Sequence, residues 1–197
     1  MSVTNALLDN NDRYASSFTK GDLPMLPRKK LAVLACMDAR LDVHKILGLE
    51  DGDAHVIRNA GGVVTEDAIR SLVISQRLLG TEEIILIHHS DCGMLTFADD
   101  DVKRQIELET GIRPPFALEA FSDVAEDVQQ SVARIKASPF IRSRSKVRGC
   151  VTRKCVQIAS VASSAAPWTP DMGPVRWTPQ HLGNQASQGG RRADPSP

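Results

Sequence analysis

The sequence predicts an α/β fold with a central, mostly parallel β-sheet flanked by helices. Two apolar runs, Leu31–Cys36 and Ile84–His89, have the length of buried strands, and each ends abruptly in polar residues. A shorter extended segment at residues 55–57 and a helical pattern from Thr65 to Gly80 lie between them. This alternation of strands and helices favours parallel pairing through right-handed crossovers.

Local signals predict where these elements begin and end. An apolar pattern over residues 41–47 indicates a short helix that ends at Gly48. Thr65 suits the N-cap of the longer helix, and the acidic pair Glu66–Asp67 complements the positive end of its dipole. Just before this cap, Gly61–Gly62 permits a positive φ or a close approach of the backbone, as a tight strand-to-helix turn requires.

Composition divides the chain into three parts. Residues 1–23 form a polar N-terminal arm with a short helical pattern. Residues 24–151 form the α/β domain, which includes two further amphipathic helix candidates at 98–110 and 119–137. Residues 152–197 are rich in Ser, Pro, Gly, Gln and Arg and lack periodicity, so we expect a disordered tail.

The overall composition is that of a soluble globular protein. Of the 197 residues, 42% are hydrophobic and 24% are charged, which is enough for one domain with a core. We expect no membrane association, because no segment approaches the length of a membrane span. We also expect no nucleic-acid partner: the three cations Arg28–Lys30 are typical of a solvated strand start.

The cysteines favour a reducing compartment. Cys36, Cys92, Cys150 and Cys155 are too few and too scattered for a disulfide framework. The first residues do not form a basic segment followed by an apolar one, as a secretory signal would. We therefore expect a cytoplasmic protein. Cys150 and Cys155 have unusual spacing for a metal or redox pair, so we interpret them as incidental thiols.

Three side chains at the ends of the two main strands form a candidate metal site. Cys36 closes the first apolar run, and His89 and Cys92 close the second. Carboxyl ends of neighbouring parallel strands meet at one edge of a sheet, so these groups are expected to converge there. Thiolate and imidazole are preferred zinc ligands, and three protein ligands leave a fourth position open. Each group alone could equally be an ordinary core residue.

The same residues carry a family resemblance. The motif Cys36-Met-Asp38-Ala-Arg40, the turn Arg58–Gly62 and the motif His89–Gly93 resemble, in order and spacing, the β-class carbonic anhydrases, especially their short microbial members. The resemblance runs from about residue 25 to about residue 141. Beyond it, Lys146–Val151 is similar to the strand that follows in this family, and the rest of the chain is atypical.

This resemblance implies a zinc-dependent carbonate dehydratase that interconverts carbon dioxide and bicarbonate by attack of zinc-bound hydroxide. It implies Cys36, His89 and Cys92 as Zn²⁺ ligands, and Asp38 and Arg40 as catalytic residues. Paired with Arg40, Asp38 would leave the fourth position to water; rotated inward, it would itself be a metal ligand. The resemblance also implies a homodimer or homotetramer, with the N-terminal arm packed on a partner subunit.

Two other functions remain compatible with the sequence. A hydrolase of the same family that acts on carbon disulfide or carbonyl sulfide would use the same metal ligands and differ in its access channel. A non-catalytic zinc-binding protein would keep the ligands but lose activity through the atypical C-terminal region. The substrate-binding residues are not predicted.

Overall fold

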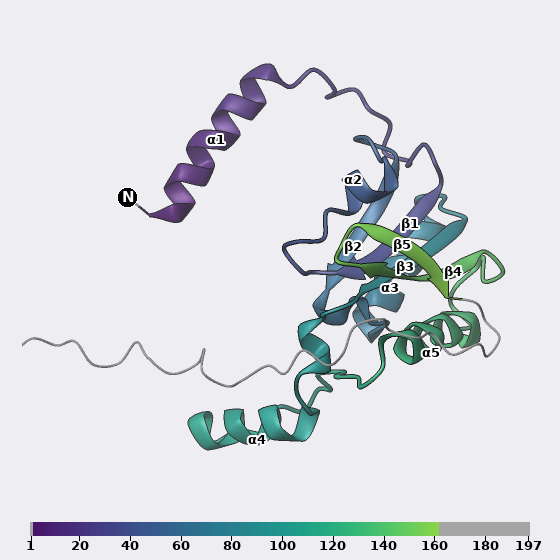
Figure 1. The fold of residues 1–197 in the computed structure, drawn as a ribbon. Helices are drawn as coiled ribbons and strands as arrows, with labels where there is room; N and C mark the ends of the chain where they lie inside the picture. Colours follow the sequence, from purple (N-terminus) through teal and green to yellow (C-terminus); the bar gives the residue numbers. More distant parts are fainter. Residues whose placement is uncertain (1, 162–197) are drawn as a thin grey trace, which may run out of the picture. The chain divides into compact units, whose positions relative to one another are not determined.

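The structure, a computed structural model, describes residues 2–161 (Figure 1). A five-stranded sheet in the order β2-β1-β3-β4-β5 forms its centre. Its strands are β1 (Leu31–Cys36), β2 (Ala54–Asn59), β3 (Glu83–His89), β4 (Val147–Arg153) and β5 (Gln157–Val161). The first four are parallel, and β5 runs antiparallel to β4. The predicted fold class is confirmed, and β1 and β3 are neighbours as expected.

Four helices lie where the local signals predicted them, although the one predicted over 119–137 begins at Val124, and the short helical pattern of the N-terminal arm becomes a helix of 15 residues. The helices are α1 (Val3–Ser17), α2 (Val43–Leu47), α3 (Glu66–Arg77), α4 (Asp99–Thr110) and α5 (Val124–Ala137), with short 3₁₀ turns η1 (Ala60–Gly62) and η2 (Gly93–Leu95). The Thr65 hydroxyl accepts a hydrogen bond from the Ala68 amide at 3.2 Å and so caps α3. Gly48 ends α2 in the left-handed conformation that glycine adopts without strain.

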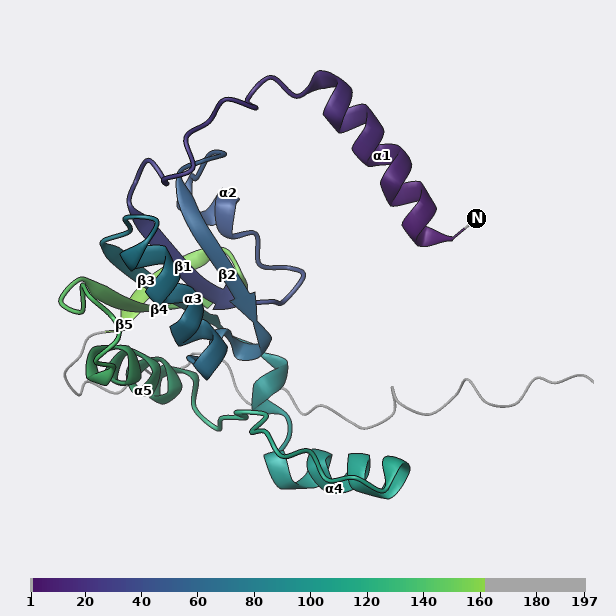
Figure 2. The same cartoon turned by 180° about the vertical axis from the view of Figure 1, so that it is seen from behind.

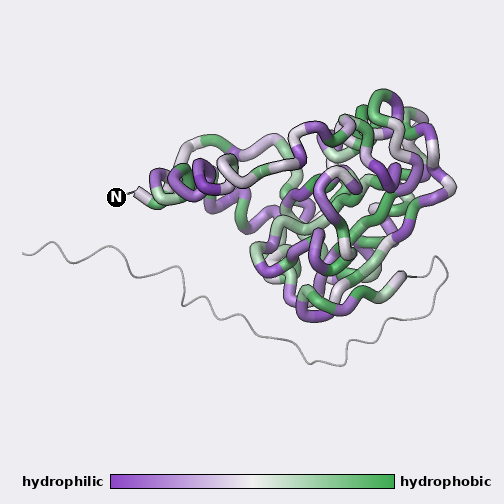
Figure 3. The backbone as a smooth tube through the Cα atoms, turned by 90° about the horizontal axis from the view of Figure 1, so that it is seen from above, coloured by the Kyte–Doolittle hydropathy of each residue, from purple (hydrophilic) through white to green (hydrophobic). Residues whose placement is uncertain are grey.

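The sheet separates two cores, because side chains alternate along each strand. Ile84 and Leu86 of β3 point to the face that α3 and α5 cover, whereas Ile85 and Ile87 point to the face where α2 packs. Figures 1 and 2 show α3 and α5 side by side on their face. In the tube of Figure 3, hydrophobic and hydrophilic stretches alternate along the chain. The sheet is thus buried on both faces, as a parallel sheet requires.

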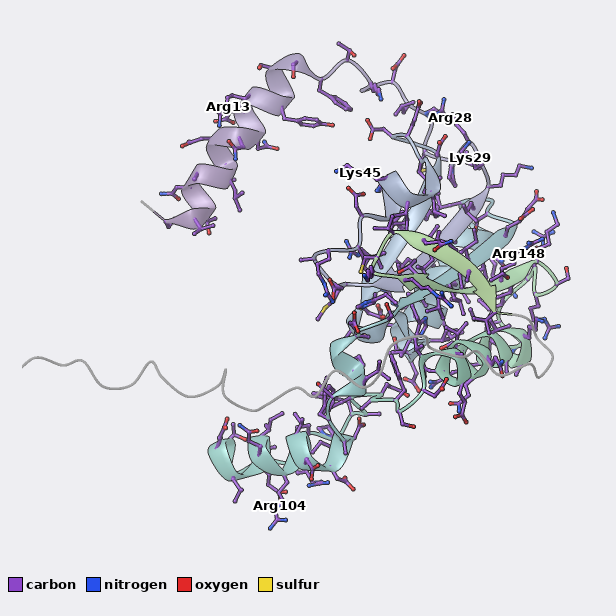
Figure 4. The ribbon with its side chains drawn as sticks, viewed as in Figure 1. Arg13, Arg28, Lys29, Lys45, Arg104 and Arg148 are labelled. Atoms are coloured by element: carbon purple, nitrogen blue, oxygen red, sulfur yellow. The ribbon has the colours of Figure 1, made fainter. Side chains whose placement is uncertain are left out.

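The cations at the entry to β1 are solvated, as predicted. The side chains of Arg28, Lys29 and Lys30 are 49%, 53% and 63% exposed, and Figure 4 shows Arg28 and Lys29 at this end of the sheet. Each pairs with a carboxylate, Asp53 for the first two and Glu82 for the third. Among residues 2–161, no helix is both long enough and apolar enough to cross a bilayer.

The predicted boundary between domain and tail at residues 151 and 152 is wrong. β4 continues to Arg153, and β5 adds an edge strand at Gln157–Val161. The sequence signal was weak because β5 pairs through its backbone and exposes most of its side chains, which need not be apolar on an edge strand. The remainder of the predicted tail, residues 162–197, lies outside the described residues.

The turn between β4 and β5 holds two residues in an unfavourable conformation. Lys154 and Cys155 have φ values of 50° and 57°, and the Val156 amide closes the turn by donating to the Arg153 carbonyl at 3.0 Å. A hairpin turn with positive φ at both central residues normally uses Asn-Gly there. A non-glycine residue in this region costs on the order of 1 kcal/mol, so packing of the hairpin must offset that cost.

A chain that ends at Arg153 is expected to be less stable than one that ends at Val161. Ending the chain at Arg153 leaves the β4 edge unpaired and removes Cys155, which is 6% exposed in the intact hairpin and packs beneath it. We expect a loss of about 2 kcal/mol, since burying one apolar side chain contributes about 1.5–3 kcal/mol, and a melting temperature lower by about 4–8 °C. Thermal unfolding of the two truncated chains measures this, and equal melting temperatures would argue against a packed hairpin.

Candidate metal centre

The ends of β1 and β3 bring the three predicted ligands together. Cys36, His89 and Cys92 offer ligand atoms that all lie within 4.8 Å of one another. The distance from Cys36 Sγ to His89 Nε2 is 3.2 Å, and that from Cys36 Sγ to Cys92 Sγ is 3.9 Å. All three side chains are buried. In the part of the chain that the structure describes, this is the one such cluster of His, Cys, Asp and Glu.

The glycine turn after β2 closes over this edge of the sheet. Gly61 and Gly62 both have φ of 76°, as the sequence predicted for this turn. A Cβ at Gly62 would lie 2.8 Å from the Cys36 amide nitrogen and 3.0 Å from the Ile87 carbonyl oxygen. Because both neighbours are backbone atoms, they cannot move aside for a side chain. Glycine therefore lets the turn approach the point where β1 delivers Cys36.

Neighbouring groups favour one thiolate in the cluster. The thiol of Cys92 donates a hydrogen bond to Cys36, and this bond, together with one from His89, lowers the pKa of Cys36 against the opposing effect of burial. The same hydrogen bond and burial raise the pKa of Cys92. Burial opposes protonation of His89, but its hydrogen bond with Cys36 and the charge there raise its pKa overall. The pair of thiols therefore shares one proton, which a metal must displace from Cys92.

The backbone fixes the orientation of the histidine. His89 Nδ1 lies 2.8 Å from the Ser90 carbonyl oxygen, which can only accept a hydrogen bond, so Nδ1 carries a proton. Nε2 faces Cys36 Sγ and is the nitrogen that would give up its proton and offer its lone pair to a metal. Cys155 Sγ lies 3.8 Å from the same Nδ1. This cysteine therefore packs behind the ligand and is not one of the three converging groups.

The carboxylate that the sequence singled out lies beside the cluster and pairs with arginine. Asp38 accepts hydrogen bonds from the Arg40 guanidinium at 2.9 and 2.7 Å and from the Arg40 amide at 2.9 Å. Its Oδ2 lies 3.7 Å from His89 Nε2. The structure thus places Asp38 in its arginine-paired arrangement, next to the three ligands but outside their cluster.

The cluster fits a zinc ion in both chemistry and spacing. Two sulfurs and an imidazole nitrogen are preferred zinc ligands, and bonds of about 2.3 Å to sulfur in a tetrahedron put the sulfurs roughly 3.8 Å apart. The observed sulfur separation is 3.9 Å. The side chains Met94, Phe97 and Phe121 pack around the same core, so the environment is apolar. Cys36, His89 and Cys92 would hold the ion.

Two further polar groups support this edge of the sheet, and the sequence analysis assigned no role to either. His88, on the opposite face of β3 from His89, is fully buried and lies 2.7 Å through Nε2 from Asp127 of α5. Arg58 of β2 donates to the backbone carbonyls of Cys36 and Asp38. The sequence offered one signal for His88, its position next to His89. It offered none for Arg58, because contacts to backbone carbonyls do not depend on the type of the partner residue.

Fold and site together define a mostly parallel α/β protein with a Cys₂His cluster, suited to a metal ion, at the carboxyl edge of its sheet. A sequence model of the carbonic anhydrase family matches residues 31–114. Beta-carbonic anhydrase 1 of Mycobacterium tuberculosis is 62% identical over 151 residues, which are 77% of this chain and 92% of that protein. The chain belongs to the β-carbonic anhydrase family, which confirms the resemblance.

Two other relatives bear on fold and substrate. The crystal structure of carbonic anhydrase from Streptococcus mutans aligns with a TM-score of 0.77 at 36% identity, over 82% of this chain and 99% of that chain. A carbon disulfide hydrolase from Acidianus is 46% identical over 86 residues, but these are 44% of this chain and 42% of that protein. The sequence match to this hydrolase therefore covers less than half of the chain, whereas the structure of a carbon disulfide hydrolase aligns over 85% of this chain with a TM-score of 0.62 at 28% identity.

Proposed function

We propose that this chain is a zinc-dependent carbonic anhydrase that converts carbon dioxide and water to bicarbonate and a proton, and back. The observation that carries the proposal is the buried Cys₂His cluster with the Asp38–Arg40 pair beside it. Family membership supports the enzyme class and the reaction. The assignment of individual residues is our own inference from the geometry.

Each side chain of the site would have a distinct task. Cys36, His89 and Cys92 hold the metal, and a bound zinc ion supplies a hydroxide nucleophile near neutral pH. Asp38, fixed by Arg40, would accept a hydrogen bond from the nucleophile and direct its lone pair toward the carbon of carbon dioxide. Apolar neighbours limit the access of other water. Bicarbonate and one proton then leave to solvent.

The carbon disulfide hydrolases are weaker models for this chain. Their sequences match this chain over about two fifths of its length, against about three quarters for the mycobacterial carbonic anhydrase. Because both kinds of enzyme are expected to use the same ligands, the metal site does not separate them. The two kinds of enzyme are separated by measuring carbon dioxide hydration and carbon disulfide hydrolysis on the same preparation.

The test is zinc content together with a stopped-flow assay of carbon dioxide hydration on the full chain. We expect one zinc per chain and rapid hydration. One zinc per chain with no hydration from pH ~7 to ~9, the range around the near-neutral pKa of zinc-activated water, would reject the proposed activity and favour a non-catalytic zinc protein. A preference for carbon disulfide would favour the hydrolase.

We further propose that the working unit is a homodimer or a homotetramer. α1 contributes no buried residue in the single chain, yet Val3, Leu7, Tyr14 and Phe18 share one helical face and are 78%, 60%, 58% and 41% exposed. Figure 3 shows hydrophobic and hydrophilic segments alternating along this helix. An unpartnered apolar face is typical of an interaction site, and a second copy of the chain is the partner that the family favours.

Leu7→Asp is expected to shift the protein toward the monomer, because a carboxylate in an apolar interface is strongly unfavourable. Asn5→Asp, on the opposite face of α1, introduces the same residue type and should leave the oligomer intact. Sedimentation velocity of the two variants and the parent chain measures the effect. If Leu7→Asp assembles like the parent, α1 does not form the interface.

For the location of the enzyme we propose the cytoplasm. The four cysteines are all free in the described residues, and the site needs two of them as thiols that can bind metal. A reducing compartment keeps them in that state.

A further inference from the structure

We infer that Arg58 is a positioning residue that fixes the metal-binding end of β1. The inference rests on the proposed function, since it assigns Arg58 a role toward the zinc ligand Cys36 and the carboxylate residue Asp38. Arg58 itself touches neither the sulfur nor the carboxylate in any hydrogen bond that the structure records; it acts on the backbone that carries them.

Three hydrogen bonds join Arg58 to this backbone. Its Nε and one terminal nitrogen donate to the Cys36 carbonyl oxygen at 3.0 and 2.9 Å, and a terminal nitrogen donates to the Asp38 carbonyl oxygen at 2.6 Å. One planar guanidinium thus sets the separation of two carbonyls that lie two residues apart. A lysine ammonium lacks this fixed fork, so it cannot reproduce the arrangement.

The bonds lie where regular pairing in the sheet stops. Asn59 is the β2 partner of Cys36, and the Asn59 carbonyl oxygen accepts the Met37 amide at 2.8 Å as the last backbone bond between the two strands. Beyond Met37 the chain leaves the sheet, and Asp38 has no partner strand. Arg58 extends the connection between β2 and β1 one residue beyond Met37, to the carbonyl of Asp38.

The charge of Arg58 is available for this task. In the described residues Arg58 makes no ion pair with a carboxylate, whereas Arg40 is committed to Asp38. Arg40 therefore orients the side chain of Asp38, and Arg58 holds its backbone. The two arginines together determine where the carboxylate lies relative to the metal ligands.

Arg58→Ala is expected to bind zinc about 10–100-fold more weakly than the parent chain, the usual effect of removing a group that supports a metal ligand. The zinc affinity of Arg58→Lys should lie between those of Arg58→Ala and the parent chain. Arg77→Ala is the matched control, because Arg77, at the end of α3, also donates to a backbone carbonyl, but to that of Phe140 at 2.9 Å and not to a residue of the metal site. Zinc affinity is measured by competition with a chromophoric chelator, and melting temperature is recorded for each metal-free variant.

A loss of zinc affinity in Arg58→Ala that exceeds the loss in Arg77→Ala supports the inference. Equal affinities in the two variants would overturn it, since a merely structural arginine would affect both alike. If Arg58→Ala does not fold, Arg58→Lys provides the test. Weaker zinc binding in Arg58→Lys than in the parent chain supports the role, and unchanged zinc affinity rejects it. The readout does not depend on turnover, so a parent chain that binds zinc without hydrating carbon dioxide would refute the proposed function and still test Arg58.

Discussion

Cys92→Ser is expected to lose zinc and with it all carbon dioxide hydration. A neutral hydroxyl is a far poorer zinc ligand than a thiolate, and a site with three protein ligands has none to spare. Removing only a supporting group costs about 10–100-fold in metal affinity, so we expect the loss of a ligand to exceed a hundred-fold. Cys92 is 3% exposed, which leaves little room for water to replace the sulfur.

Zinc content after dialysis and the hydration rate measure this effect. Cys150→Ser is the matched control, because Cys150 is also a buried thiol, with a pKa that burial raises, but it belongs to β4 and not to the cluster. The control should retain one zinc per chain. Stoichiometric zinc and full activity in Cys92→Ser would remove this residue from the ligand set.

The part of the site that the sequence predicted comes from one geometric rule. In a parallel sheet the carboxyl ends of neighbouring strands share an edge, so Cys36 and His89, each closing an apolar run, had to meet once β1 and β3 were adjacent. Cys92 follows His89 by three residues and is carried along by the same strand end. Ligand type, strand pattern and spacing were all visible in the sequence.

The rest of the site depends on contacts that leave little trace in sequence. Arg58 binds carbonyl oxygens, which every residue possesses, so no partner residue type marks its role. Cys155 reaches His89 only because β5 turns back along β4, and the polar edge strand gave no clear periodic signal. Neither could be placed until the pairing of strands was known.

Asp38→Ala is expected to keep zinc but to lose about a hundred-fold or more in turnover, the usual cost of misplacing a reacting group. The carboxylate lies outside the cluster of three ligands, so zinc retention should not depend on it. Asp42→Ala is the control: Asp42 is also a carboxylate near the end of β1, but it caps α2 by accepting the Lys45 amide. Wild-type turnover in Asp38→Ala would exclude this carboxylate from the mechanism.

The pH profile separates the roles of Asp38 and of the metal. Hydrogen bonds from Arg40 hold the pKa of Asp38 well below its usual range, so this carboxylate is ionised at every pH above about 4, the ordinary pKa of an aspartate. A carboxylate with a lowered pKa changes its charge only in acid, so its titration cannot raise activity near neutrality. We therefore expect hydration to rise from pH ~7 to above ~8, where water activated by zinc loses its proton.

Loss of the negative charge in Asp38→Ala should make that proton leave more easily and move the midpoint of the pH profile to lower pH. Hydration rates of zinc-loaded parent and variant across this range measure both midpoints. A flat parent profile would contradict the zinc-dependent step, and a midpoint that moves to higher pH would contradict the position of Asp38 beside the metal.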